Sequence, residues 1–178
     1  MISGKIKRGK KGQATIELPF QMIFSLILIA IFIYAAFTGI KYFLERADQA
    51  KINSFIAEIK SDVGSAWQAT EVGRVYTYNL PDKIKSVCFG NLGTALKNNT
   101  CPQFEKYRKE AYNEGANMFF CPPSSAYGVG SPYYYKIECD GSDCLSAVGA
   151  GVTCIKNNGK ISIALEKKLG NPKVVISA

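Results

Sequence analysis

The chain has 178 residues, six cysteines, no histidine and a formal net charge of +8. Without histidine, neither a Ser-His nor a Cys-His catalytic pair can form, and no glycine-rich loop with a phosphate-binding lysine is present. The composition therefore predicts a protein that is not an enzyme and that has no cofactor and no metal site.

The N-terminal part predicts a membrane segment behind a basic leader. Residues 1–12 carry five Lys and Arg residues and no acid. Residues 18–44 are nearly all apolar and would make about 40 Å of helix, enough to cross a bilayer core of about 30 Å. Because basic flanks stay in the cytoplasm, we expect the C-terminal part outside. A conventional cleaved signal peptide fits less well, since the run is longer than its usual apolar region and no small-residue cleavage site follows.

Glu17 argues against a plain uncleaved anchor, because a carboxylate beside an apolar run is costly in lipid unless it has a partner. Solvation at the membrane edge is the alternative. The order of basic leader, Gly12-Gln13, Glu17 and apolar run resembles the N-terminus of type IV pilins. More narrowly, residues 8–45 are similar to archaeal proteins with a class III signal peptide.

The resemblance implies that a membrane prepilin peptidase cleaves between Gly12 and Gln13. The cytoplasmic basic leader 1–12 is then removed, and residues 13–44 remain as a transmembrane and filament-core helix. It also implies that Glu17 meets the new amine of Gln13 on a neighbouring subunit during assembly. Because proline favours the first turn of a helix, Pro19 leads us to expect regular helical bonding from about Ile16 onward.

The basic charge lies mainly in the leader. Without residues 1–12, 17 Lys and Arg residues face 14 acids, which leaves a net charge of +3. Nucleic-acid binding needs clustered Lys and Arg residues, and only short pairs such as Lys167-Lys168 remain. We therefore expect no nucleic-acid partner.

Residues 45–72 predict an amphipathic continuation of the same helix, to about Thr70. Apolar residues recur there at spacings of three and four, which is typical of one buried helical face. The stripe consists of Ile52, Phe55, Ile56, Ile59, Val63, Ala66 and Trp67. We expect it to pack on the following domain. A break at Gly39 into a membrane helix and a separate soluble helix is the alternative.

Residues 73–178 predict an extracellular β-rich domain. The sequence favours a helix over 103–114 and strands over 75–80, 84–89, 117–121, 133–139, 152–156, 160–166 and 173–177. Asn157-Asn158-Gly159 is typical of a tight hairpin turn between the two strands that flank it. A long N-terminal helix followed by a mainly antiparallel β-sheet is an α+β fold, and this order also suits a pilin.

All the cysteines follow the apolar run: Cys88, Cys101, Cys121, Cys139, Cys144 and Cys154. An even number outside a membrane predicts disulfides. Zinc is disfavoured because only Cys139 and Cys144 are close together, and partly free thiols are the remaining alternative. Six cysteines allow 15 pairings, which the sequence leaves open.

Three further features have two interpretations each. Asn98-Asn99-Thr100 is a glycosylation sequon that would place a glycan on Asn98, or it is an Asn-rich turn. Tyr127 and residues 133–135 offer an aromatic contact patch, or alternate tyrosines fill the core. The acids near Asp140-Gly141 are typical of a turn, since a calcium loop needs more ligands.

The leading hypothesis is a structural subunit of an archaeal type IV pilus-like filament, resident in the membrane before assembly and at the cell surface afterwards. Its expected partners are the peptidase, identical or related pilins, a pilus assembly platform and the membrane. The alternatives are a monomeric membrane-anchored extracellular binding protein and a minor pilin at the filament tip.

Overall fold

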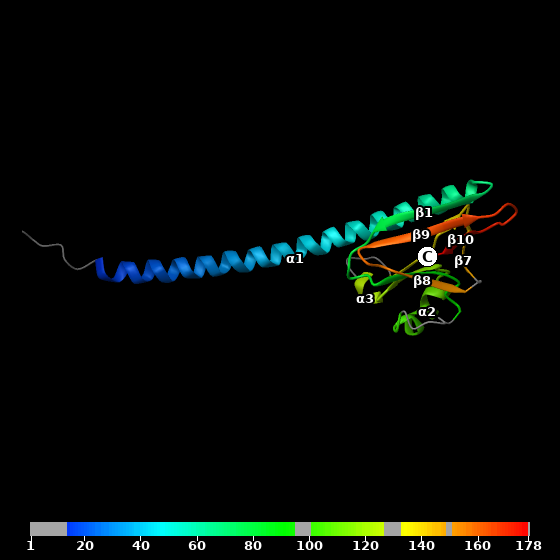
Figure 1. Cartoon of the computed structure of the whole chain (residues 1–178). Helices are drawn as coiled ribbons and strands as arrows, with labels where there is room; N and C mark the ends of the chain where they lie inside the picture. Colours follow the sequence, from blue (N-terminus) through cyan, green and yellow to red (C-terminus); the bar gives the residue numbers. More distant parts are fainter. Residues whose placement is uncertain (1–13, 95–100, 127–132, 149–150, 178) are drawn as a thin grey trace, which may run out of the picture. The chain divides into compact units, whose positions relative to one another are not determined.

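The structure is a computed structural model that describes residues 14–94, 101–126, 133–148 and 151–177, without the side chains of residues 14–18, 125 and 126. Its contacts divide the chain into two units, Met1–Leu44 and Glu45–Ala178. We call the second unit the head. One helix, α1 (Ala14–Gln68), supplies residues to both units (Figure 1). The predicted continuation of the helix is therefore confirmed, and the alternative break at Gly39 is wrong.

The start of α1 differs from the prediction. The helix begins at Ala14 and contains Pro19, whereas regular bonding was expected from about Ile16. Proline has a fixed backbone angle that is itself helical, and its missing N–H removes only the bond to the carbonyl of Thr15. One absent bond near the end of a long helix is not enough to delay its start.

In its described residues, the head contains two four-stranded sheets, a two-stranded hairpin and two short helices. The first sheet has the order β1 (Val72–Asn79), β9 (Lys160–Lys167), β10 (Val174–Ser177) and β7 (Leu145–Ala147). The second sheet has the order β4 (Tyr134–Tyr135), β3 (Met118–Cys121), β2 (Ser86–Gly90) and β8 (Val152–Lys156). The hairpin joins β5 (Glu138–Cys139) and β6 (Ser142–Asp143), and the helices are α2 (Phe104–Asn113) and α3 (Pro123–Ala126). Only the β10–β7 pair is parallel among these strands, so the predicted α+β class with a mainly antiparallel sheet is confirmed.

One core joins α1 to both sheets. The predicted stripe of α1 is buried from Ile52 to Ala66, and Trp67 packs half-buried beside it. Phe55 of α1 makes edge-to-face contacts with Tyr78 of β1 at 5.3 Å and with Phe120 of β3 at 5.9 Å between ring centroids. The amphipathic helix therefore packs on the head as expected.

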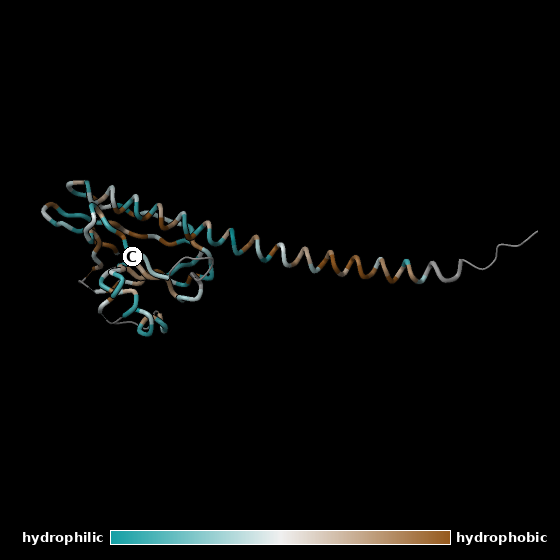
Figure 2. Tube along the Cα trace, turned by 180° about the vertical axis from the view of Figure 1, so that it is seen from behind, coloured by the Kyte–Doolittle hydropathy of each residue, from teal (hydrophilic) through white to brown (hydrophobic). Residues whose placement is uncertain are grey.

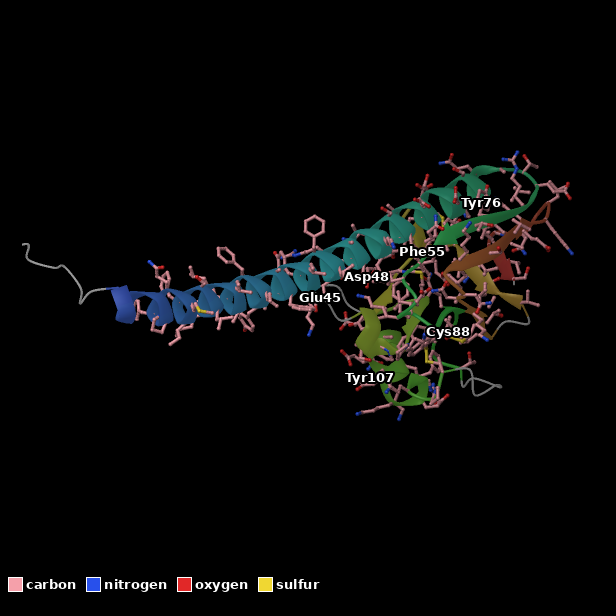
Figure 3. The ribbon with its side chains drawn as sticks, turned by 60° about the vertical axis from the view of Figure 1, so that its left-hand side comes forward. Glu45, Asp48, Phe55, Tyr76, Cys88 and Tyr107 are labelled. Atoms are coloured by element: carbon pink, nitrogen blue, oxygen red, sulfur yellow. A yellow bond between two sulfur atoms is a disulfide. The ribbon has the colours of Figure 1, made fainter. Side chains whose placement is uncertain are left out.

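The two sheets are covered differently. Along β9, Ile161, Ile163 and Leu165 are buried and the residues between them are not, so the first sheet buries one face. Every residue of β2 and β3 is buried, so the second sheet is covered on both faces. Its second cover is α2, whose Phe104 packs edge-to-face on Phe119 at 5.2 Å. Within the head, α1 and α2 thus lie on opposite sides of the second sheet (Figure 1, Figure 3).

The predicted hairpin at Asn157-Asn158-Gly159 is wrong. The strands before and after it, β8 and β9, belong to different sheets, so these residues form a corner. The side-chain amide of Asn157 is buried and donates to the carbonyls of Pro81 at 3.1 Å and Ile84 at 2.8 Å. These bonds tie the corner to the segment before β2 and direct the chain from one sheet to the other.

The predicted strand 133–139 is interrupted. Residues 136 and 137 separate β4 from β5 because the side chain of Asn117 takes the place of a neighbouring strand. Its amide oxygen accepts from the N–H of Ile137, and its nitrogen donates to the carbonyl of the same residue, both at 2.8 Å. A side chain thus satisfies backbone groups that a strand would otherwise pair.

All six cysteines form disulfides, as predicted. Cys88 pairs with Cys154, Cys101 with Cys121, and Cys139 with Cys144. The first joins directly opposite residues of β2 and β8, and the third closes the β5–β6 hairpin. Asp140 and Gly141 form the turn of that hairpin, with φ of 47° and 75°. The predicted turn at these residues is therefore confirmed.

Candidate functional site

We define the apolar segment as residues 19–44 of α1, a stretch that is mostly hydrophobic in its residue colours (Figure 2). Its large apolar side chains are exposed. Phe20, Phe32 and Phe43 are 71%, 71% and 76% exposed. Residues 19–40 contain no charged side chain and make about 33 Å of helix, close to the thickness of a bilayer core. Within the described ranges, α1 is the one helix long and apolar enough to cross a membrane. Exposed apolar surface on this scale marks contact with lipid or with other protein.

The hydroxyl groups of Ser25 and Thr38, inside the apolar segment, are bonded to the helix itself. Ser25 donates to the carbonyl of Gln21 at 2.8 Å, and Thr38 lies 2.9 Å and 3.1 Å from the carbonyls of Ala35 and Tyr34. A hydroxyl that bonds to its own helix needs no water. These two polar residues are therefore compatible with an apolar environment.

The residues predicted for processing and assembly are only partly described. Gly12, Gln13 and Asn98 lie outside the described residues. Glu17 is the fourth residue of α1, and its side chain also lies outside the description.

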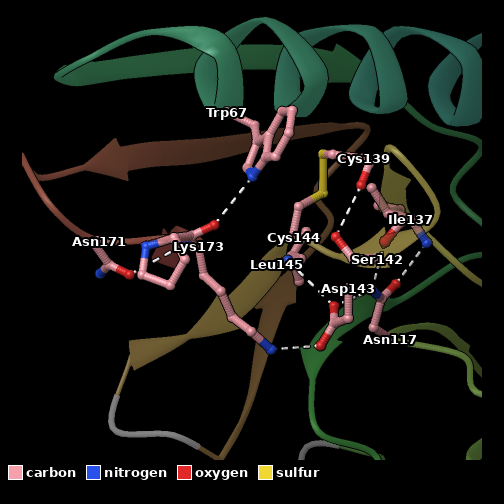
Figure 4. Close-up of polar contacts among 11 residues, drawn as sticks. Trp67, Asn117, Ile137, Cys139, Ser142, Asp143, Cys144, Leu145, Asn171 and Lys173 are labelled. Atoms are coloured by element: carbon pink, nitrogen blue, oxygen red, sulfur yellow. Dashed lines mark hydrogen bonds and ion pairs between the residues drawn. A yellow bond between two sulfur atoms is a disulfide. The ribbon is translucent and has the colours of Figure 1, made fainter.

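A polar network fixes the β5–β6 hairpin to the rest of the head (Figure 4). Asp143 accepts from the amide of Asn117 at 2.9 Å, the Leu145 N–H at 3.2 Å and Lys173 at 2.7 Å. Partial burial alone would raise the pKa of Asp143, but the hydrogen bonds from Lys173 and Asn117 outweigh burial and hold its pKa below the usual value. The carboxylate thus stays ionised and paired.

A hollow of about 590 Å³ lies beside this network, with Asn117, Lys136, Asp143 and Lys173 among its lining residues. Lys136 is paired with Glu138 at 2.5 Å, and Lys173 with Asp143. Both lysines are therefore paired with an acid, which reduces the positive charge that they present to the hollow. Its arrangement is suited to holding the hairpin in place and, at most, to weak polar binding.

A second set of contacts holds α1 on the first sheet. The indole N–H of Trp67 donates to the carbonyl of Pro172 at 3.1 Å, and Lys167 of β9 donates to the carbonyl of Trp67. A cation at the last carbonyls of a helix also interacts favourably with its dipole. The end of α1 is therefore fastened to both the first sheet and the segment before β10.

The tyrosines expected either in a surface patch or in the core lie mostly in the core. Tyr133 is buried, and Tyr134 and Tyr135 pack half-buried against it, whereas Tyr127 lies outside the described residues. Tyr133 also donates to Glu110 of α2 at 2.6 Å.

Sequence patterns did not indicate Asn117 or Asn157, the two buried asparagines that organise the head. Asn117 is the first residue of a predicted strand, and Asn157 is the first residue of a predicted turn, where asparagine is common. Their position at the ends of strands was the one sequence feature available. That position does not predict whether a side chain is buried or exposed.

Comparison of the chain with known protein families, with curated proteins and with solved structures found no match. The exposed apolar helix is of a kind that can anchor a protein in a membrane, and the three disulfides indicate an oxidising, extracellular environment for the head.

Proposed function

We propose that this protein is a structural subunit of a type IV pilus-like surface filament, anchored in the membrane before assembly and built into the filament through α1. The observation that carries the proposal is the apolar segment, which is exposed on α1 and is attached to a head with its own core and three disulfides. Such a segment is unstable in water and needs lipid or other apolar helices around it.

Assembly would exchange lipid contacts for contacts between helices. Helices associate in an apolar environment by van der Waals packing and by hydrogen bonds between polar side chains. In this proposal a prepilin peptidase first removes residues 1–12, and an assembly platform then adds the subunit to related or identical subunits. Glu17 pairs with the amine of Gln13 on a neighbour, because a charge buried in such a bundle needs a partner.

The role of the protein is structural rather than catalytic in this proposal. The sequence has no histidine, and Lys136 and Lys173 beside the hollow of about 590 Å³ are each paired with an acid. A monomeric extracellular binding protein is the second candidate, and the hollow of about 590 Å³ is the observation that favours it. An inert anchor has no need of the Gly12-Gln13 and Glu17 arrangement, which is why we place the filament first.

Intact mass of the protein from its native membrane or surface fraction tests processing. We expect a chain that begins at Gln13 and keeps the apolar segment. A chain that still carries residues 1–12 would favour the inert anchor, and a start beyond Ala35 would identify an ordinary signal peptide and contradict the proposal.

Filament yield from a Glu17→Ala variant tests assembly. We expect processing at Gln13 to continue and the yield of filaments to fall at least about tenfold, since an unpaired buried amine costs several kcal/mol. Glu45→Ala is the matched control, because Glu45 is an exposed acid of the same helix beyond the apolar segment, and its filaments should be normal. Normal filaments from Glu17→Ala would contradict the pairing.

A further inference from the structure

Lysines from three separate segments gather at one end of the head. The segments are residues 45–51 of α1, residues 80–85 before β2, and residues 156–160 at the corner between β8 and β9. Lys83 lies 3.3 Å from Asp48 of α1. The N–H of Leu80 donates to the carbonyl of Gly159 at 3.4 Å, and the N–H of Asn157 donates to the carbonyl of Lys85 at 2.8 Å.

We call this surface the basic pole. Its cations are Arg46, Lys51, Lys83, Lys85, Lys156 and Lys160, and all of them are exposed except the half-buried Lys83. Lys51 borders a hollow with Asn79, Leu80 and Gly159, so α1 and the two other segments meet at a common surface.

The net charge of the head is concentrated at the basic pole. Glu45–Ala178 holds sixteen Lys and Arg residues and thirteen acids. The three segments contain six of those cations and three of those acids, Glu45, Asp48 and Asp82, so the rest of the head is neutral. Glu58, the next acid along α1, borders the same hollow as Lys51, and the pole stays positive even when Glu58 is counted with it.

The basic pole includes the residues of the head that directly follow the apolar segment in the chain. Leu44 precedes Glu45 directly, and Asp48 follows Leu44 by only about 6 Å of helix. Tyr42 and Phe43, both exposed, immediately precede this point, and aromatic residues are enriched where helices leave a bilayer. If the apolar segment spans a membrane, the residues of α1 in the pole lie at the depth of the lipid headgroups.

We propose that the basic pole binds anionic phospholipid headgroups and holds the head against the membrane before assembly. This inference rests on the proposed membrane anchoring of the apolar segment. Lys and Arg residues within a Debye length of an anionic surface are attracted to it, and salt weakens the attraction. The rest of the head is neutral overall, so the head of a second copy offers no net negative charge to the pole. An anionic lipid surface does offer one, and we therefore favour lipid as the partner.

The test uses the full chain, one copy per lipid nanodisc, in phosphatidylcholine with and without phosphatidylglycerol. Acetylation of each lysine is followed by mass spectrometry. We expect Lys83, Lys85, Lys156 and Lys160 to react about threefold more slowly with the anionic lipid at low salt. The effect should vanish near 1 M salt, where the Debye length is about 3 Å. Lys106 and Lys109 of α2 are not part of the pole and should react equally in both lipids. Equal rates at the pole would overturn the proposal.

A pair of matched variants separates the pole from general charge. Lys85→Glu with Lys160→Glu should abolish the protection of Lys83 and Lys156, whereas Lys106→Glu with Lys109→Glu should leave it intact. An unchanged thermal midpoint shows that each variant is folded. Protection that persists in the first pair would overturn the proposal.

Two other outcomes are distinguishable in the same experiment. A chain that does not stay in the nanodisc contradicts membrane anchoring and, with it, both proposals. A chain that stays in the disc, but whose pole is protected only with two copies per disc and equally in both lipids, assigns the pole to a subunit contact. That outcome overturns the lipid proposal and leaves the filament proposal standing.

Discussion

The hydroxyl of Tyr78 donates a 2.7 Å hydrogen bond to the carboxylate of Asp62, which joins β1 to α1 across sixteen residues of chain. The ring of Tyr78 is 3% exposed and also packs edge-to-face on Phe55. One side chain therefore contributes both an apolar and a polar contact to the attachment of α1. Burial, followed by the bond to Asp62, raises the pKa of Tyr78 above its usual value.

Replacing Tyr78 by phenylalanine should lower the free energy of unfolding by about 1 kcal/mol at neutral pH, because the ring is kept and one bond to a charged acceptor is lost. The raised pKa predicts a difference in pH dependence as well. Below pH 10 the native protein keeps this contribution, and it is lost as the pH rises, since the unfolded tyrosine ionises near pH 10 and the folded one does not. Tyr78→Phe should therefore lose less stability than the native chain between neutral pH and pH 11.

Thermal and denaturant unfolding of the full chain in detergent measures both effects. Tyr112→Phe is the matched control, because Tyr112 on α2 is 54% exposed and should tolerate the change. An identical alkaline dependence in Tyr78→Phe and the native chain would contradict the assigned role of the buried hydroxyl.

The three disulfides should differ in what they contribute to stability. Their partners are separated by 66, 20 and 5 residues for Cys88–Cys154, Cys101–Cys121 and Cys139–Cys144. Loop-closure entropy then predicts losses of roughly 4, 3 and 2 kcal/mol when each pair is replaced by alanine. The thermal midpoint of each double variant gives the order. A larger loss for Cys139–Cys144 than for Cys88–Cys154 would show that contacts in the hairpin, rather than chain entropy, dominate.

The parts of the fold that depend on neighbouring residues in sequence could be predicted. The stripe from Ile52 to Trp67 repeats every three or four residues, so its helix and buried face follow from the order of side chains. The alternation of Ile161, Ile163 and Leu165 identifies a strand with one buried face for the same reason. The exposed apolar character of residues 19–44 also follows from composition alone.

Contacts between residues far apart in the chain could not be predicted from local sequence patterns. The corner at Asn157 has the sequence of a hairpin turn, but its two strands enter different sheets because its side chain bonds to Pro81 and Ile84, more than seventy residues earlier. The pairing of Cys88 with Cys154 follows from the register of β2 with β8, which the sequence does not specify. The proposed contact between Glu17 and Gln13 involves two chains and therefore stays a prediction.

Gly90 is required by the close approach of two backbones. It ends β2 with φ of 115°, and a Cβ there would collide with the carbonyl of Gly151 and lie 2.8 Å from the Cβ of Ala147. We expect Gly90→Ala to cost at least about 2 kcal/mol, from the unfavourable backbone angle and the collision together. Gly73→Ala is the control, since a Cβ at this position of β1 meets nothing within 4 Å. Equal unfolding midpoints for the two variants would contradict the steric explanation.

Asn157→Asp should be among the most destabilising isosteric changes in the head. The native amide donates two hydrogen bonds to carbonyls in a buried corner, and an ionised carboxylate would instead place negative charge beside both of them. We expect a loss of about 3 kcal/mol or more at neutral pH. The buried carboxyl should have a raised pKa, so the deficit should shrink as the pH falls and the unfolded chain also becomes protonated, near pH 4.

The neighbouring change Asn158→Asp provides the control, because Asn158 has an exposed side chain in the same corner. Its unfolding free energy should stay within about 0.5 kcal/mol of the native value. Urea unfolding at neutral pH and near pH 4 distinguishes the two variants. A deficit in Asn157→Asp that is independent of pH would mean that shape, rather than the two donated hydrogen bonds, makes this asparagine necessary where the chain passes from one sheet to the other.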